Sequence, residues 1–162
     1  MTKNHAITSI VIGILCGFWA GIAPEIGLSI WAGFAACTAF FASGRHKLDG
    51  LAITITTTLV GVAIALLMIE GSDVIGAPLG TAISVGILVT VIVMLGVLKF
   101  LAFIPGMFVG CYSTFAIDAD WQLLGASLLA GAVLGMLCDS AADLAVAKLG
   151  SPQTQPTATV EV

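Results

Sequence analysis

The chain has 162 residues, of which 59% are hydrophobic and only 9% are charged, and its mean hydropathy is +1.16. A soluble domain carries roughly 25% charged residues, so the composition excludes a soluble protein. Five Lys and Arg residues against nine Asp and Glu residues leave a net charge of -4, without the basic patch that nucleic-acid binding requires. We therefore expect one integral membrane domain that has the lipid bilayer as its surroundings and no nucleic-acid partner.

Six apolar segments follow one another along the chain. Backbone groups in a bilayer need internal hydrogen bonds, and the segments lack the alternation of barrel strands, so they predict an all-α protein with six transmembrane helices. The predicted bounds are 6–23, 26–41, 51–69, 77–98, 100–117 and 121–138, the last continuing to about residue 149. Residues 1–150 then form one domain, and the polar segment 151–162 is predicted to be a disordered cytoplasmic tail.

Polar turns are predicted between the helices, among them residues 24–25, 43–47, 70–73 and 118–120. With six spans, one side of the membrane receives every basic residue: Lys3, Arg45, Lys47, Lys99 and Lys148. The other side receives an acidic set: Glu25, Glu70, Asp73, Asp118 and Asp120. The positive-inside rule therefore predicts that both termini are cytoplasmic and that the outer mouth is acidic.

The two halves of the chain, about 6–69 and 77–149, look like copies of each other. A shift of 74 residues gives six identities over the 31 positions from Trp31 to Gly61, where about three are expected by chance. The identical positions include the pair Cys37 and Cys111. Because a unit of three helices crosses the membrane an odd number of times, the second copy is predicted to be inverted, as in many channels and transporters.

Two blocks of sequence resemble a known family. They are SIWAGF at 29–34 with CTAFFA at 37–42, and FIPGMFVG at 103–110 with TFA at 114–116 and DW at 120–121. Together they resemble the bacterial inner-membrane family called domain of unknown function 1097, over about residues 13–150. The resemblance implies a location in the bacterial inner membrane, and it implies no substrate because the family has no established activity.

The second and fifth segments are the notable pair. Residues 26–41 would reach only about 24 Å as a helix, less than the hydrocarbon core of about 30 Å. The matching segment carries Pro105 and Gly106 inside its apolar run. Short or interrupted segments at matching places in two halves indicate a solute path. The alternative is that Pro105 starts a helix and that the small residues are packing contacts.

Polar or aromatic side chains at the predicted depth of these two helices are the candidate pore-lining residues: Trp31, Cys37, Thr38, Pro105, Cys111, Ser113 and Thr114. Trp19 and Trp121 are predicted to be interfacial anchors, which leaves Trp31 as the interior tryptophan. Membrane-embedded hydroxyls also commonly bond to their own backbone, which is the alternative for each Ser and Thr. No Asp, Glu, Lys, Arg or His lies in the middle of a span, and this disfavours an ion-coupled transporter.

Glycines recur every four residues along three segments and predict close helix packing: Gly13, Gly17, Gly21, Gly106, Gly110, Gly131 and Gly135. Such grooves serve either a homo-oligomer or contacts within one subunit. The four cysteines have no metal-ligand spacing, so neither a metal nor another cofactor is expected. Asp139 and Asp143 are predicted to be a solvated helix end, and no catalytic motif is present, so an enzyme is not expected.

These observations lead to an expected function. The first hypothesis is a passive channel or facilitator for a small neutral or weakly cationic solute of unknown identity, with its path between the second and fifth helices. The second is a non-transporting membrane subunit that binds a partner protein through its glycine-rich faces. The third, disfavoured above, is an ion-coupled transporter. A homo-oligomer is expected because one small subunit offers little wall for a pore.

Overall fold

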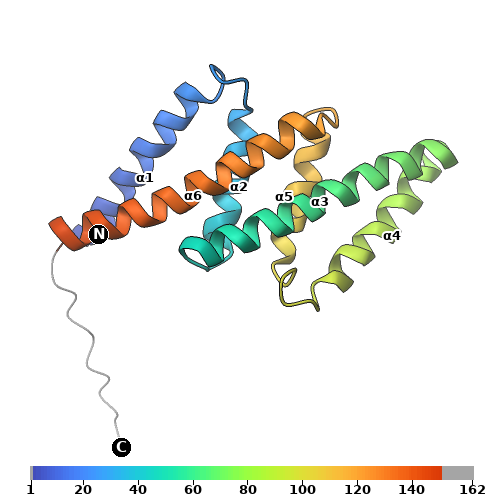
Figure 1. Ribbon diagram of the computed structural model, residues 1–162. Coiled ribbons are helices and arrows are strands. Elements are labelled where there is room, and N and C mark those ends of the chain that lie inside the picture. The colour runs from blue at the N-terminus through green and yellow to red at the C-terminus, as the bar shows by residue number, and fades with distance from the viewer. Residues whose placement is uncertain (1, 151–162) are drawn as a thin grey trace, which may run out of the picture.

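The computed structural model describes residues 2–150, and over these residues the regular structure is helical (Figure 1). The six helices are α1 (Lys3–Ile22), α2 (Ile30–Ala42), α3 (Lys47–Ile75), α4 (Leu79–Leu95), α5 (Ile104–Ala116) and α6 (Trp121–Leu149). The predicted all-α class is thus confirmed. Three helices, α1, α3 and α6, are long and apolar enough to cross a membrane, whereas α2 and α4 are shorter apolar helices. The predicted tail at 151–162 lies outside the described residues.

The predicted turn at residues 70–73 is wrong, because these residues are the last part of α3. The side chains of Glu70 and Asp73 are exposed, and nothing in their backbone interrupts the helical hydrogen bonds. Helix α3 instead stops at Gly76, whose φ of 90° lies in a region that side chains with a Cβ rarely adopt. The first half therefore extends to residue 75 rather than 69.

Helix α5 begins at Ile104, four residues later than predicted, so Pro105 occupies its first turn. A proline at this place loses nothing, since the first N–H groups of a helix have no partner within the helix. Of the two interpretations of Pro105, a helix start and a break inside a span, the structure favours the helix start.

The two long helices organise the packing (Figure 1). Helix α3 packs mainly on α5 and α4, while α6 packs mainly on α2 and α1, and α3 and α6 also contact each other. Helices α2 and α5 touch near the centre, whereas α1 and α4 lie at the periphery. Each long helix thus packs against one short helix and one peripheral helix: α3 against α5 and α4, and α6 against α2 and α1.

The helix bounds repeat along the chain. Adding 74 to the bounds of α2 and α3 gives the bounds of α5 and α6, and both long helices end at a glycine, Gly76 or Gly150. By this correspondence α3 is equivalent to α6, and α5 is equivalent to α2. The packing of α3 on α5 is therefore equivalent to the packing of α6 on α2, and both contacts are present. The contacts therefore follow the same plan in both halves.

Small residues let the helix backbones meet. A Cβ added at Gly61 of α3 would collide with the carbonyl oxygen of Met107 of α5. The predicted packing glycines of α5 and α6 are equally enclosed, since added Cβ atoms would collide with Thr57, Thr58, Gly33 and Phe40 at Gly106, Gly110, Gly131 and Gly135 respectively. By contrast, a Cβ at any of the three α1 glycines, Gly13, Gly17 and Gly21, meets no atom within 4 Å. Of the seven predicted packing glycines, the four on α5 and α6 therefore pack inside this subunit and the three on α1 do not.

A buried carboxylate joins α6 to the start of α3. Asp139 accepts a hydrogen bond from the backbone N–H of Lys47 at 3.1 Å, and its other oxygen lies 2.8 Å from Nδ1 of His46. The expectation of a solvated Asp139 is wrong, since this side chain is only 8% exposed, although Asp143 one turn later is 63% exposed. The hydrogen bond that the Asp139 carboxylate accepts from the imidazole, together with the negative charge of the carboxylate, raises the pKa of His46 above its usual 6.5.

Candidate functional site

A pocket of about 280 Å³ lies between the start of α2 and the end of α5. Its lining residues come from the two short helices and their ends: Ser29, Trp31, Ala32, Ala35, Tyr112, Ser113, Ala116 and Ile117. Ligand pockets commonly enclose about 300–1,000 Å³, so this one falls just below that range. The size fits a small molecule.

Hydrogen bonds fix the α2 wall of this pocket. The hydroxyl of Ser29 accepts from the N–H of Ala32 at 3.3 Å and so caps the first turn of α2. The backbone N–H of Ser29 donates to the hydroxyl of Ser127 on α6 at 2.9 Å. The start of α2 is thereby held on the long helix behind it.

A tight turn forms the α5 side. Asp118 and Ala119 have positive φ angles of 51° and 60°, and the Ala119 N–H donates to the carbonyl of Thr114 at 3.0 Å. Asp120 then caps α6, accepting from the N–H of Leu123 at 3.1 Å. Because Ile117 lines the pocket and precedes Asp118 directly, exposed carboxylates flank the pocket. These two carboxylates contribute a negative electrostatic potential on the α5 side of the pocket.

Two of the seven predicted pore-lining residues, Trp31 and Ser113, line this pocket. Trp31 is 76% exposed and packs edge-on against Phe34, with ring centroids 6.1 Å apart, so its predicted interior position is wrong. The buried tryptophan is Trp19, predicted to be an interfacial anchor, whose indole N–H donates to the carbonyl of Ile30 at 3.2 Å. Its ring fills the space that a side chain at Gly33 would need.

The other five candidates lie outside the lining of this pocket. Pro105 and Thr38 are exposed on α5 and α2. Thr114 is fully buried and donates to the carbonyl of Gly110 at 2.9 Å. The remaining two, Cys37 and Cys111, are buried on different sides: Cys37 lies near other cysteines of α1 and α6, and Cys111 donates to the sulfur of Met68 on α3 at 3.8 Å.

Most membrane-depth threonines bond to their own helix. In each case the hydroxyl donates to the carbonyl four residues earlier, and this holds for Thr56, Thr57, Thr58, Thr90 and Thr114. Backbone bonding, the alternative interpretation, is therefore correct for these five. Within residues 2–150, the Thr54 hydroxyl is fully buried and has no partner.

A smaller pocket of about 140 Å³ lies at the other end of the molecule, lined by Arg45, Asp49, Ala52, Ile53, Thr56 and Phe100. Along α5, the segment from Gly106 to Gly110 precedes the residues of the larger pocket and packs directly on Thr57 and Thr58 of α3. Such close contact leaves no room for a solute at this level of the α3–α5 interface.

The sequence did not indicate Ser29, Tyr112 or Ile117 as pocket residues. The N-cap pattern at Ser29, a serine before an apolar run, is a signal that was available. Nothing in the local sequence places Tyr112 or Ile117 opposite α2, because that juxtaposition depends on the crossing of two helices 74 residues apart.

The comparisons with known proteins agree with the membrane assignment. Residues 9–143 match the family described as "Protein of unknown function (DUF1097)". Inner membrane protein YcdZ of Escherichia coli (strain K12) is 41% identical over 131 residues, which cover 78% of each chain. YcdZ of Salmonella typhimurium (strain LT2) is 38% identical over 130 residues, 78% of this chain and 80% of that protein. The Escherichia coli protein named "Uncharacterized protein YahC" is 27% identical over 147 residues, 82% of this chain and 87% of that one. No solved structure matches the chain.

Proposed function

Since the chain belongs to the DUF1097 family of proteins of unknown function, its activity has to be argued from its own residues, and we propose that it is an inner-membrane channel or facilitator. It passes small neutral or weakly cationic solutes down their gradient. The observation that carries the proposal is the pocket of about 280 Å³ between the two short helices. The names of the YcdZ relatives support the inner-membrane location.

The proposed topology has six spans in two inverted halves, with both termini cytoplasmic. The 74-residue repeat of the helix bounds and the matching packing plan support it. In Figure 1 the α1–α2, α3–α4 and α5–α6 connections lie on the upper side, and the α2–α3 and α4–α5 connections lie on the lower side. Arg45 and Lys99 belong to the lower connections, whereas Glu25 and Asp118 belong to the upper ones. This partition of charge follows the positive-inside rule.

Helix length explains why a pocket forms where it does. At 1.5 Å per residue, the 13 residues of α2 or α5 reach only about 20 Å, against a hydrocarbon core of about 30 Å. The 29-residue helices α3 and α6 are long enough to cross the core even when tilted. Backbone that leaves a helix at membrane depth is tolerated only where it lines a cavity or is covered by protein. The ends of α2 and α5 are therefore suited to be the ends of a solute path.

Selectivity follows from size and charge. The pocket admits only a small solute, and the carboxylates of Asp118 and Asp120 beside it repel anions. The middle of each span carries no ionisable side chain to couple a proton, so the proposed flux is passive. On its other side α5 packs closely on α3 through Gly106 and Gly110, so the proposed path does not run between these two helices.

Flux measurements in proteoliposomes test this proposal. Ser113→Leu fills the pocket and should abolish protein-dependent uptake of a panel of small neutral solutes, followed by stopped-flow light scattering. Thr38→Leu is the matched control, because it makes the same kind of change at an exposed position outside the pocket lining. Equal flux in wild-type and Ser113→Leu liposomes would remove the pocket from the path.

A second candidate function is helix-mediated assembly, with another copy or with a different membrane protein. The observation that favours it is the open face of α1, where Gly13, Gly17 and Gly21 meet no atom within 4 Å and Ile14 and Phe18 are exposed. A glycine groove beside large apolar side chains suits packing against another helix. We propose that this face joins copies of the chain into a homo-oligomer.

Cross-linking in mild detergent tests the assembly. Gly17→Leu should reduce the cross-linked oligomer, whereas Gly86→Leu, at an equally open glycine of the other peripheral helix, should not. A wild-type protein that is monomeric in detergent and in liposomes would contradict the homo-oligomer.

A further inference from the structure

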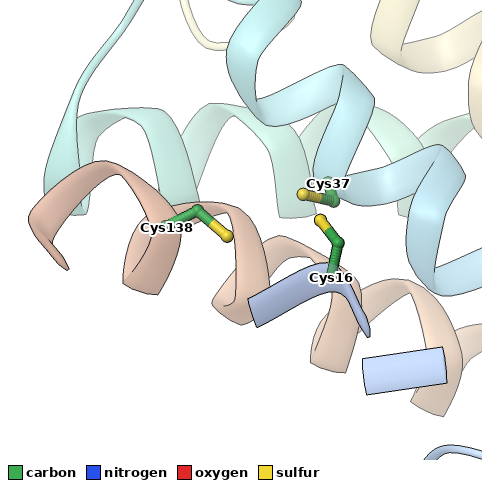
Figure 2. A group of neighbouring side chains, drawn as sticks. All are labelled: Cys16, Cys37 and Cys138. Carbon is green, nitrogen blue, oxygen red and sulfur yellow. The ribbon is translucent and has the colours of Figure 1, made fainter. Parts of the chain in front are cut away.

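Three cysteines that are far apart in the sequence meet inside the fold. Cys16 lies on α1, Cys37 on α2 and Cys138 on α6, and their sulfur atoms all lie within 4.8 Å of one another. Figure 2 shows the three side chains turned toward a common point between the helices. No local sequence motif indicates this cluster, because each of the three helices contributes only one cysteine.

The surroundings of the three-cysteine cluster are apolar. Cys37 and Cys138 are buried and Cys16 is half-buried. They pack with Trp19, Leu134 and other hydrophobic side chains. A disulfide between two of the three cysteines would leave the third thiol unpaired, whereas a single metal ion can be coordinated by all three sulfurs. At a metal–sulfur length of about 2.3 Å, three sulfurs around one centre lie about 3.5–4 Å apart, which fits within the 4.8 Å limit on the separation of the three sulfurs.

The charge of the complex decides which ion the cluster suits. Three thiolates carry three negative charges, and an uncompensated charge among apolar side chains at membrane depth is costly. A complex with Cu(I) would keep two negative charges and one with Zn(II) would keep one, but a trivalent ion gives a neutral complex. The nearest charged side chain in sequence is Asp139, which neighbours Cys138. Its carboxylate is bonded to His46 and to the Lys47 N–H, and it cannot neutralise the thiolates because it is itself negative.

We propose that Cys16, Cys37 and Cys138 form a binding site for a trivalent thiophilic ion, for which As(III) is the probe. In the binding step, neutral As(OH)₃ exchanges three As–O bonds for three As–S bonds. Each thiol proton leaves with a hydroxide as water, so three waters are released and no atom changes oxidation state. The site is independent of the solute path proposed above.

The second half of the chain provides a matched control. Cys111 is the counterpart of Cys37 at a distance of 74 residues and is also buried, but its sulfur contacts Met68 instead of other cysteines. The counterparts of Cys16 and Cys138 are Thr90 and Ile64. The three-thiol arrangement, to which both halves contribute, is therefore not repeated at the equivalent place formed by α3, α4 and α5.

Arsenic binding to the purified full-length protein in detergent tests the site. Wild type and Cys111→Ser should each retain one arsenic per chain from arsenite, measured by elemental mass spectrometry, with three thiols lost to a thiol reagent. Cys16→Ser, Cys37→Ser and Cys138→Ser should each weaken retention at least tenfold. If a serine variant fails to fold, X-ray absorption of the wild-type complex still decides, with three As–S bonds expected.

Three results would overturn the proposal. They are retention of arsenite by Cys37→Ser at the wild-type level, an absorption spectrum that shows remaining As–O bonds, and tighter binding of Cu(I) than of arsenite to the wild-type protein. The last of these would contradict the charge argument specifically.

Discussion

Removing the carboxylate of Asp139 should weaken the fold where α6 meets the start of α3. His46, the N-cap residue of α3, makes no side-chain capping bond, and Asp139 supplies the missing acceptor to the Lys47 N–H. Such a cap is worth about 1 kcal/mol, and a negative charge at a helix N-terminus adds about 0.3–1 kcal/mol. Asp139→Ala should therefore cost about 1–2 kcal/mol. Asp139→Asn keeps an acceptor and should cost only the charge component.

The pH dependence of this effect has a definite sign. Asp139 raises the pKa of His46 above 6.5, its value in the unfolded chain. The pair of protonated His46 and ionised Asp139 therefore stabilises the fold fully below pH 6.5. This stabilisation is lost as the pH rises through the raised pKa of His46, where the imidazole loses its proton. The difference in melting temperature between wild type and Asp139→Asn should be larger at pH 6 than at pH 9.

Thermal unfolding in mild detergent at the two pH values provides the measurement. Asp143→Ala is the control, because this exposed carboxylate lies 3.9 Å from the Lys47 ammonium and such pairs contribute about 0–1 kcal/mol. Equal losses for Asp139→Ala and Asp143→Ala, or an Asp139→Asn effect that does not change with pH, would refute the reasoning.

Three further predictions follow from the topology, the charge and the packing. With the native cysteines replaced, Asp73→Cys should be labelled from outside whole cells by an impermeant reagent and Lys47→Cys should not; the reverse pattern would refute the proposed orientation. Asn at both Asp118 and Asp120 should slow cations and leave neutral solutes unchanged in liposome flux, because a surface field screened over about 8 Å acts only on charge; equal slowing of both would disprove this. Gly61→Ala should cost about 2 kcal/mol in detergent unfolding, since its Cβ would collide with α5, while Gly17→Ala at an open position should cost much less; similar losses would contradict the packing.

The helical elements were largely predictable from the sequence because hydrophobic run length is a local property. The prediction failed where it treated charge as a stop signal: Glu70 and Asp73 continue α3, since a charged side chain at a helix end can reach solvent while the backbone stays helical. Gly76, which ends the helix through its backbone conformation, was the stronger signal. The 74-residue shift found from a few identities anticipated the helix bounds of the second half.

The side-chain environments were predicted less well, because they depend on which helices cross. Trp19 and Trp31 exchange their expected positions, since burial follows the packing of α1 on Gly33 and not the depth of the residue along its span. The pairing of Asp139 with His46 joins residues 93 positions apart. The three-cysteine cluster likewise has no sequence spacing to reveal it, as three helices contribute one residue each.

The most direct test of the proposed function is the distribution of a small neutral solute across liposomes that contain the wild-type protein. A passive channel accelerates equilibration, ends at equal concentrations on both sides, and is unaffected by a protonophore. Protein-dependent accumulation above the outside concentration that a protonophore abolishes, or a rate equal to that of protein-free liposomes for every solute tried, would contradict it.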